Sequence, residues 1–330
     1  MGHVPPGRAM ESGVPPFGPS ASWEVLRRRA ELLTELRSFF ADRGFLEVET
    51  PLLCRDSVVD LHIDPFAVEV SQPPGETWWL QTSPEFCMKR MLAAGATAIY
   101  QVTRAFRQGE IGRWHNPEFT MVEWYRCGDD MRAGMALLAE LAQAMLGADS
   151  VLQIEYAELF RQGTGIDPLD ATDKALREAA RCHGLDAAGE STRDDCLDFL
   201  FATRVVPSLP REVPAVVYYY PASQAALSRL DPRDDRRAER FELFFRGVEL
   251  ANGYHELTDA AEWRRRARAA NRRRASRGKR EIPVDSALLR AMESGLPAGS
   301  GTALGFDRLV MAALRRRSLS EVMAFPWERA

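Results

Sequence analysis

Apolar residues recur at helix or strand spacing along most of the chain, and these patterns predict its main elements. Over residues 23–43 they return every three or four positions, which predicts an amphipathic helix that stops at Gly44. Residues 45–48 predict a strand that ends by Pro51 at a sheet edge, because proline has no N–H to donate to a strand ladder. A second helix is predicted over Met131–Leu146.

Two runs of β-favouring residues, 98–102 and 119–125, flank a charged loop and predict a hairpin. In the second strand the side-chain period of two separates an aromatic and acidic face from a bulky apolar face. The first face carries Phe119, Met121, Glu123 and Tyr125, and the second carries Thr120, Val122 and Trp124.

The rest of the chain mixes helical and strand patterns. Residues 151–214 carry short helical patterns bounded by Gly and Pro and predict a helical insertion over the core. Residues 216–220 and 241–250 predict strands, and residues 301–314 pass from a Gly-rich strand into a helix. This order predicts an α+β fold with an antiparallel sheet flanked by helices.

The composition of the 330 residues is that of a globular protein, with 45% hydrophobic residues. A net charge of −4 argues against a general nucleic-acid binder. Residues 1–21 are rich in Pro, Gly and Ser and predict a disordered tail before one folded domain over 22–330; no apolar run in them suits a signal peptide or membrane span. The five widely spaced cysteines form no CxxC and indicate neither a disulfide framework nor a zinc site, so we expect a cytoplasmic protein.

The predicted hairpin carries residues suited to a nucleotide. Arg107 begins its loop, and a planar guanidinium can grip a phosphate or carboxylate with two hydrogen bonds. Phe119 and Glu123 stand roughly 13 Å apart along the next strand, a span that fits a flat base at one end and a cationic group at the other. An ordinary amphipathic hairpin with a surface arginine explains this segment equally well. The sequence has no GxGxxG or GxxxxGK[ST] loop, which excludes a Rossmann or P-loop site.

Two further segments carry candidate ligands for a nucleotide or its metal. Glu249 and Glu256 flank Gly253, where we expect the strand to break, and paired carboxylates suit Mg²⁺ when phosphates complete its shell. Two solvated surface acids are the plainer interpretation. Gly305 and Arg308 would let a backbone approach an anion at a helix start.

Two other segments have a plain structural interpretation. Ser83 is predicted to cap a helix that begins at Pro84 and Glu85. Residues 264–280 hold ten Lys or Arg, which predict a solvated helix or loop or, alternatively, a docking surface for an acidic partner.

Three segments, in order, resemble the signature motifs of class II aminoacyl-tRNA synthetases, and of lysyl-tRNA synthetase in particular. GFLEVETPLL (44–53), FRQGEIGRWHNPEF (106–119) and GTALGFDRL (301–309) are similar to motifs 1, 2 and 3. TSPEF, HNPEFTMVEWY and ERFELFFRGVELANGYHEL are lysine-type in detail. The resemblance covers residues 23–329 and implies a class II catalytic domain that uses ATP and Mg²⁺ and forms a homodimer through motif 1.

The resemblance also implies roles for individual residues. Arg107 would bind the α-phosphate of ATP, Phe119 would stack on adenine, and Arg308 would hold the far end of the nucleotide. The other residues expected at the ATP site are Gln108, Gly109, Glu110, Asn116, Glu249, Leu250 and Gly305. Those expected at the amino-acid site are Ser83, Pro84, Glu85, Glu123, Tyr125, Glu256 and Ala303. Glu85 would receive the amino group near the carboxylate, and Glu123 with Tyr125 the distal ammonium. Glu249 and Glu256 would hold Mg²⁺ or the substrate amine, and Arg107, Arg308 and Glu249 would be catalytic.

The segment before motif 1 is too short for the OB-fold domain with which a lysyl-tRNA synthetase reads the anticodon, so no anticodon recognition is expected. The chain therefore resembles the elongation factor P lysyltransferases, paralogues that attach β-lysine to a lysine of elongation factor P. Ala303 stands where lysyl-tRNA synthetases usually have Gly, and its methyl group would reshape the pocket for a β-amino substrate. Gly109 stands at the Glu position of motif 2, which leaves Glu110 or a backbone group to meet the adenine edge.

The resemblance implies activation of β-lysine or lysine as an adenylate, followed by transfer to an ε-amine of elongation factor P. One alternative is a ligase of the same chemistry that acts on tRNA or a small amine. Another is a non-catalytic regulatory paralogue, against which the retained phosphate and metal groups argue. No membrane partner is expected.

Overall fold

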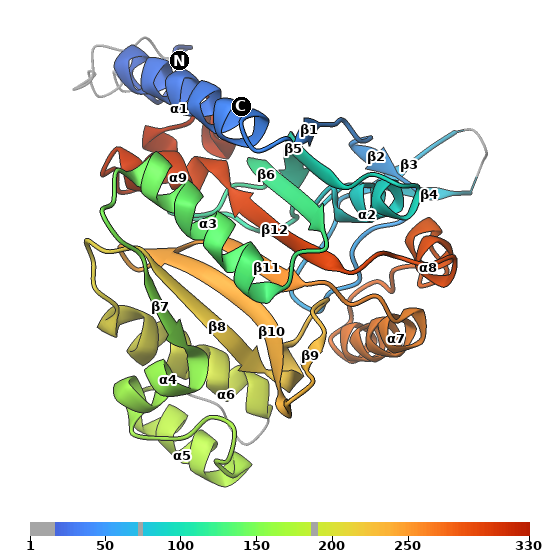
Figure 1. Ribbon diagram of the computed structural model, residues 1–330, viewed down its shortest axis with the longest axis vertical. Helices are drawn as coiled ribbons and strands as arrows, with labels where there is room; N and C mark the ends of the chain where they lie inside the picture. Colours follow the sequence, from blue (N-terminus) through green and yellow to red (C-terminus); the bar gives the residue numbers. More distant parts are fainter. Residues whose placement is uncertain (1–16, 72–74, 186–190) are drawn as a thin grey trace, which may run out of the picture.

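The computed structural model describes residues 17–71, 75–185 and 191–330, which build a nine-stranded sheet with a three-stranded sheet beside it (Figure 1). The strands are β1 (Leu46–Glu47), β2 (Leu53–Cys54), β3 (Ala67–Glu69), β4 (Thr77–Leu80), β5 (Ala98–Phe106), β6 (Glu118–Cys127), β7 (Leu152–Glu155), β8 (Ala215–Pro221), β9 (Leu230–Asp231), β10 (Asp234–Phe245), β11 (Val248–His255) and β12 (Gly299–Gly305). The α-helices are α1 (Trp23–Ala41), α2 (Glu85–Ala93), α3 (Met131–Leu146), α4 (Tyr156–Thr164), α5 (Asp173–Cys182), α6 (Arg193–Leu200), α7 (Ala260–Ser276), α8 (Ala287–Glu293) and α9 (Phe306–Ala313). Shorter helical turns are η1 (Phe201–Val205), η2 (Val206–Ser208), η3 (Ala222–Gln224), η4 (Leu319–Glu321) and η5 (Trp327–Arg329).

The large sheet runs in the order β1-β5-β6-β12-β11-β10-β8-β7, and β9 adds to β10. All its pairs are antiparallel except the two at the edges, where β1 lies parallel to β5 and β7 parallel to β8. The predicted α+β class is therefore confirmed, with a mixed sheet in place of a purely antiparallel one.

The predicted hairpin is the pair β5 and β6, whose strands are longer than the sequence pattern indicated. The predicted faces of β6 are confirmed, because Val122 and Trp124 are buried in the main core while Phe119, Glu123 and Tyr125 line a pocket on the other side. A single strand thus joins the hydrophobic core to the pocket.

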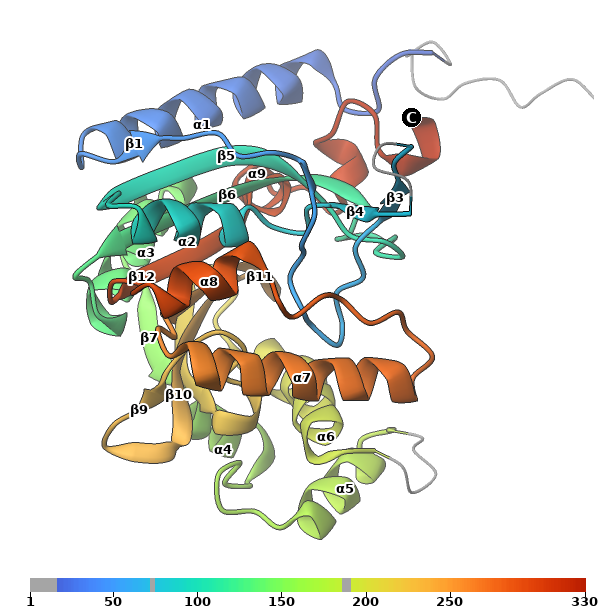
Figure 2. The ribbon, with the colours of Figure 1, turned by 90° about the vertical axis from the view of Figure 1, so that its right-hand side faces the viewer.

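The two faces of the large sheet are covered differently. Helices α1, α3 and α9 pack their apolar sides on one face and form the main core. On the other face, α4, α5 and α6 build a second cluster against β8 and β10, while α2, α7 and α8 build a third near β5 and β6 (Figure 2). The uncovered stretch of sheet between the second and third clusters is where the pocket lies.

Two predicted strand assignments need correction. Residues 241–250 form part of a hairpin, with a turn at Arg246 and Gly247, where both backbones have positive φ (54° and 78°). Gly253 does not break the strand; it lies inside β11, where a Cβ would sit 2.3 Å from the ring of Phe241. Glycine is needed there because the aromatic ring occupies the space of a side chain.

The expected helical insertion, residues 151–214, also contains a strand. Its first residues form β7, which pairs with β8 and so belongs to the large sheet. Only the remainder is helical, from α4 to η2.

The predicted tail ends before Ser20. The Ser20 N–H donates to the carbonyl of Ala324 at 2.7 Å, and the Ala21 N–H donates to the carbonyl of Met323 at 3.2 Å. Ala21 is buried in the main core, which is why this segment is held. Residues 1–16 of the predicted tail lie outside the described residues. Among the residues the structure does describe, no helix combines the length and apolar character needed to cross a membrane.

Candidate active site

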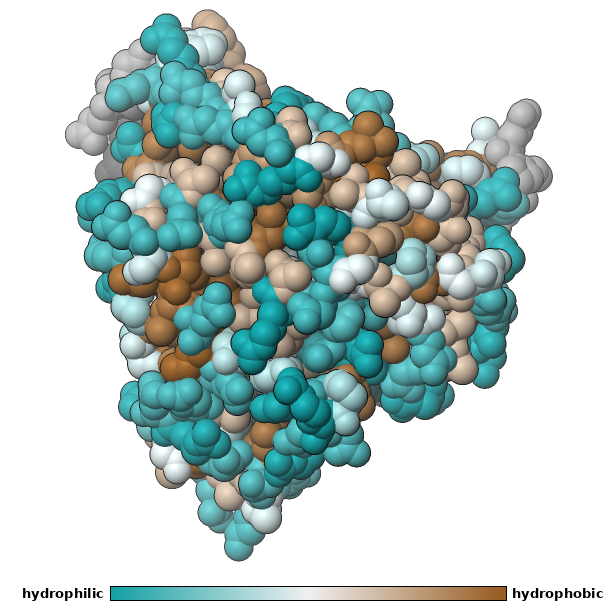
Figure 3. All heavy atoms as spheres, viewed as in Figure 1, coloured by the Kyte–Doolittle hydropathy of each residue, from teal (hydrophilic) through white to brown (hydrophobic). Residues whose placement is uncertain are grey.

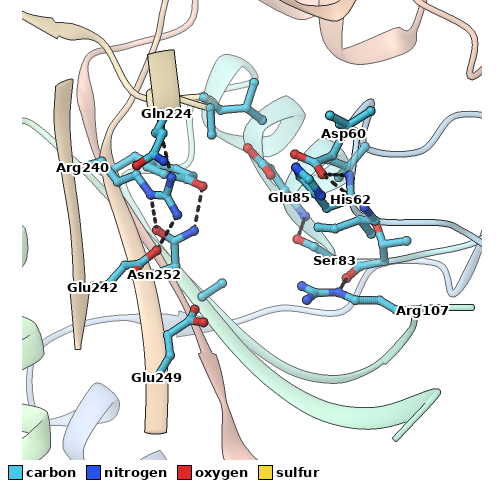
Figure 4. Close-up of a pocket in the computed structure, with 18 of the residues that line it drawn as sticks. Asp60, His62, Ser83, Glu85, Arg107, Gln224, Arg240, Glu242, Glu249 and Asn252 are labelled. Atoms are coloured by element: carbon cyan, nitrogen blue, oxygen red, sulfur yellow. Dashed lines mark hydrogen bonds and ion pairs between the residues drawn. The ribbon is translucent and has the colours of Figure 1, made fainter. Parts of the chain in front are cut away.

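A cavity of about 740 Å³ opens on the sheet face between the second and third hydrophobic clusters. Its walls come from β6, β10, β11 and β12, from α2 and α7, and from the loop at residues 58–63. Figure 4 shows Ser83, Glu85 and Arg107 on one side of the cavity and Arg240, Glu249 and Asn252 on the other. Of the predicted site residues, only Pro84, Gln108 and Gly109 do not line it.

Arg107 lies beside Phe119 at one end of the cavity. Its guanidinium carbon is 5.1 Å from the centre of the Phe119 ring, and its Nε donates to the carbonyl of Thr82 at 3.4 Å. Arg107 Nη1 also lies 3.7 Å from Glu110 Oε1. Gly109 makes the turn between them with a φ of 81°, so a glycine suits this position in motif 2. Glu110 is the carboxylate that the structure places beside Arg107, and it lines the cavity.

Arg308, at the start of α9, is held by the hairpin loop and by β11. Its Nε donates to the carbonyl of Trp114 at 3.0 Å, and its Nη1 donates to the carbonyl of Glu249 at 3.0 Å. Glu249 Oε2 lies 3.7 Å from the same nitrogen. Two arginines, Arg107 and Arg308, therefore reach the Phe119 end of the cavity from separate elements, an arrangement that suits a polyphosphate.

Asn116 supports this end of the cavity more than it faces into it. Its amide Nδ2 donates to the carbonyl of Glu118 at 2.6 Å, and its Oδ1 accepts from the N–H of Trp327 at 2.8 Å. The side chain is 7% exposed, so its polar atoms hold the hairpin loop to the C-terminal segment.

Acidic residues gather at the other end. Glu123 is 2% exposed, and it accepts hydrogen bonds from Ser83 Oγ at 2.6 Å and from Tyr125 Oη at 2.5 Å. Burial, reinforced by the negative charge of Glu85, raises the pKa of Glu123 to about 8. Ser83 accepts from the Glu85 N–H at 3.1 Å, but Pro84 occupies the cap position of α2, so Ser83 is not the N-cap that the sequence predicts.

A buried lysine joins two of these acids. Lys89 Nζ lies 2.5 Å from Glu85 Oε1 and 2.5 Å from Glu256 Oε2. Burial disfavours its charge, yet Glu256 and Glu85 more than offset this effect and raise the pKa of Lys89. Burial also raises the pKa of Glu256, to about 7, against the opposing influence of Lys89.

A β-bulge brings Glu249 to the cavity. Glu256 comes seven positions after Glu249, an odd offset that in a regular strand would place the two side chains on opposite faces. The register shifts between Leu243, which pairs with Ala251, and Phe244, which pairs with Glu249, so Leu250 is an extra residue in β11. Both glutamates consequently line the same cavity.

The expected metal pair, Glu249 and Glu256, does not fit the structure. Glu256 is ion-paired with Lys89 at the amino-acid end, whereas Glu249 lies at the arginine end beside Arg308. The carboxylate that faces Glu249 is Glu242 on β10, whose pKa is raised by burial and further by the charge of Glu249. Two neighbouring carboxylates that line the cavity suit Mg²⁺ when phosphates supply the other ligands, so Glu242 fits better than Glu256.

Sequence reasoning missed Arg240 and Lys89. Arg240 pairs with Glu242, donates to Asn252 Oδ1 at 3.2 Å, and donates to the carbonyl of Gln224 at 2.7 Å. It therefore orients the polar groups of β10 and β11 that face the cavity (Figure 4). No local pattern marks it, because a strand arginine gives no sign of burial. Lys89 had one available signal, its four-residue spacing from Glu85 on a helix.

The basic residues 264–280 lie mostly on α7 and are largely neutralised within the chain. Arg274 is 2% exposed and lies 2.9 Å from Asp64, and Arg264 lies 2.6 Å from Glu293. Arg273 lies 3.8 Å from Asp194 on α6, across one edge of the cavity. These basic residues therefore stabilise the packing of α7. Their ion pairs weaken the interpretation of residues 264–280 as a free docking surface.

Comparison with known proteins identifies one family and a set of close relatives. The family described as tRNA synthetases class II (D, K and N) matches residues 19–329. A protein of Enterobacter sp. (strain 638) named "Elongation factor P--(R)-beta-lysine ligase" is 47% identical over 317 residues, which cover 94% of this chain and 98% of that protein. Proteins of the same name from Edwardsiella ictaluri (strain 93-146), 48% identical over 317 residues, and Salmonella arizonae, 46% identical over 319 residues, match with the same coverage.

Proposed function

The chain belongs to the class II tRNA synthetases of the D, K and N type and is an ATP-dependent ligase, and on that premise we propose that it activates (R)-β-lysine and transfers it to a lysine of elongation factor P. The name shared by its relatives supports both the substrate and the acceptor. One structural observation carries the proposal: the same cavity has arginines and an aromatic ring at one end and three glutamates, Glu85, Glu123 and Glu256, at the other. A nucleotide fits the first end, and an amino acid with two ammonium groups fits the second.

The first step joins the amino acid bound at one end of the cavity to the nucleotide bound at the other end. A carboxylate oxygen of the amino acid attacks the α-phosphorus of ATP, a P–O bond to pyrophosphate breaks, and an aminoacyl-adenylate forms. Arg107, which lies beside Phe119, would offset the charge that develops on the α-phosphate, while Phe119 would stack on the base and Arg308 would hold the outer phosphates. Bound Mg²⁺, held by Glu242 and Glu249, would offset further phosphate charge.

The second step requires no nucleophile from the chain. The acceptor's ε-amine attacks the acyl carbon, the C–O bond to AMP breaks, and the ammonium that forms loses a proton to give an amide. The adenylate is already activated, so positioning can supply much of the rate. The amine must arrive uncharged, which a desolvated contact between the two proteins would favour.

We further propose that the protein works as a homodimer in the cytoplasm. Two apolar side chains stand exposed within the segment that resembles motif 1: Leu46 is 63% exposed and Leu52 is 41% exposed. Figure 3 shows apolar atoms at the surface where Figure 1 places β1 and the loop after it. Sedimentation equilibrium tests this proposal, since Leu46→Glu should give a monomer if the surface is the dimer contact.

The intact mass of unmodified elongation factor P, measured after incubation with the enzyme, Mg·ATP and (R)-β-lysine, tests the proposed function. A gain of one β-lysyl unit that Arg107→Ala abolishes is the expected result. No gain, with amino-acid-dependent pyrophosphate exchange intact, would indicate tRNA or a small amine as the acceptor. No exchange with any amino acid would indicate a protein that only binds.

A further inference from the structure

Helix α2 carries a buried ammonium group against the amino-acid end of the cavity. We propose that Lys89 is a positioning residue whose ammonium fixes the carboxyl groups of Glu85 and Glu256, so that this end of the cavity accepts the two ammonium groups of its substrate at neutral pH. This inference rests on the proposed function, because it assigns Lys89 a part in binding the diamino acid.

The geometry makes Lys89 a bridge between a helix and the sheet. Glu85 lies one helical turn before it on α2, and Glu256 follows β11. The ammonium takes one oxygen from each, Glu85 Oε1 and Glu256 Oε2, at 2.5 Å. The other oxygen of Glu256 lies 2.3 Å from the point where a Cβ on Gly301 would sit, on the cavity side. Each of the two glutamates thus keeps one carboxylate oxygen that Lys89 does not contact and that a ligand can use.

Several ionisable groups surround this ion pair. Helix α2 contributes Glu85, β6 contributes Glu123 and Tyr125, and β11 with the residue after it contributes Tyr254 and Glu256. The loop at residues 58–63 adds His62, which lines the same cavity. Lys89 lies 5.8 Å from the centre of the Tyr125 ring, so its charge also reaches Glu123 and its hydrogen-bond partner.

Glu123 and Glu256 tend to hold protons, because burial and the negative charge of the neighbouring Glu85 both disfavour their charged forms. Lys89 opposes that tendency: it lowers the pKa of Glu256 and, less strongly, that of Glu123. When the substrate binds and Glu123 gives up its proton, three ionised glutamates and one lysine leave a net charge of about −2, which two substrate ammonium groups would balance. Without Lys89, Glu256 would also hold a proton more tightly, and that proton would have to leave before the substrate could form its ion pairs.

The test compares three variants in amino-acid-dependent pyrophosphate exchange. Lys89→Met removes the charge but keeps much of the bulk, and Lys89→Arg keeps the charge. Lys174→Met is the matched control, because Lys174 also forms an i,i+4 pair with a glutamate, Glu178 at 3.9 Å, on the exposed helix α5. The constants kcat and KM for (R)-β-lysine and for ATP are measured from about pH 6 to about pH 9.5, a range that spans the glutamate titrations.

Lys89→Met should raise KM for (R)-β-lysine about tenfold or more at neutral pH, leave KM for ATP within about twofold, and move the pH at which KM improves upward by about one unit. Lys89→Arg should keep both the KM for (R)-β-lysine and its pH dependence close to those of wild type. Lys174→Met should change neither. A folded Lys89→Met protein with the pH profile of wild type overturns the inference. So does a Lys89→Arg protein no better than Lys89→Met, since that outcome indicates a packing role.

Thermal melting shows whether Lys89→Met folds. If it does not, Lys89→Arg decides the matter, because a retained positive charge should keep the pH midpoint within about half a unit of wild type, and a larger shift overturns the inference. If wild type gives no exchange with any diamino acid, the proposed function fails. Calorimetric titration with (R)-β-lysine and with lysine then tests Lys89 separately, and equal affinities in wild type and Lys89→Met would overturn its role.

Discussion

The Nη2 atom of Arg308 lies 2.7 Å from the Nε2 atom of His115. Burial and the neighbouring Arg308 lower the pKa of His115, so at neutral pH the imidazole is uncharged and its Nε2 accepts the hydrogen bond. With the carbonyls of Trp114 and Glu249, His115 holds the guanidinium of Arg308 at three points. The hairpin loop of motif 2 therefore orients the arginine of motif 3.

Arg308→Lys should weaken ATP binding while leaving amino-acid binding nearly unchanged. A lysine ammonium cannot make the three fixed contacts of the guanidinium, and the loss of hydrogen bonds to a charged group costs about 1.5–3 kcal/mol, or roughly tenfold or more in KM for ATP. Exchange kinetics with each substrate varied in turn provide the measurement. The exposed Arg316→Lys is the control, and an unchanged KM for ATP in Arg308→Lys would remove Arg308 from the nucleotide site.

Gly301→Ala should close the amino-acid end of the cavity. The added Cβ would lie 2.2 Å from Tyr125 Cε1 and 2.3 Å from Glu256 Oε1, so both side chains would have to move out of their binding positions. We expect KM for the amino acid to rise about tenfold or more, equivalent to at least about 1.4 kcal/mol, with ATP binding preserved. Gly112→Ala in the hairpin loop, where a Cβ meets nothing within 4 Å, is the control. Equal KM values for the two variants would contradict this prediction.

The stability of the ligand-free protein should fall as the pH rises through the range in which Glu123 titrates. Its pKa is raised from 4.5 to about 8, so between these values the folded protein binds more protons than the unfolded chain, and the free energy of unfolding decreases with rising pH. Glu123→Gln removes this contribution. Urea denaturation of both proteins at about pH 6 and about pH 8.5 measures it, and wild type should lose more stability than the variant. An equal pH dependence in the two proteins would show that Glu123 is not protonated in the folded state.

Asp307→Ala should destabilise the fold strongly. Its Oδ2 accepts from the Thr120 N–H at 2.6 Å, and its Oδ1 lies 2.6 Å from Arg29 Nη2, so it ties α9 to β6 and α1. Asp307 is 2% exposed, and its removal leaves a largely buried arginine without this partner, which costs about 3 kcal/mol or more. Glu35→Ala, which breaks the exposed pair with Arg28, should cost less than about 1 kcal/mol. Similar denaturation midpoints for the two variants would refute the assigned role of Asp307.

The sequence predicted those parts of the site that depend on local periodicity. The alternation in β6 correctly placed Phe119, Glu123 and Tyr125 on one face, because the pattern of a half-buried strand follows from its own residues. The long helices α1 and α3 were predictable for the same reason.

What the sequence did not predict depends on pairing between distant residues. The bulge at Leu250 arises from the register between β10 and β11, and it decides which carboxylates share a face. The ion pair of Glu256 with Lys89 requires α2 to lie against the end of β11, and this packing favours the expected amine role of Glu256 over its metal role. The strand β7 was missed because four residues pairing at a sheet edge leave too short a pattern to recognise.

The hydrogen bonds of Ser20 and Ala21 with Ala324 and Met323 have a consequence for the order in which the protein assembles. A ribosome releases the start of the chain long before residue 324 has been made, and folding during synthesis generally proceeds from the N-terminal side. The beginning of α1 must therefore wait for the last residues before its contacts are complete, while the β5 and β6 hairpin can form early. Met323 and Ala324, which are synthesised late, thus complete the contacts that fix the start of the first helix.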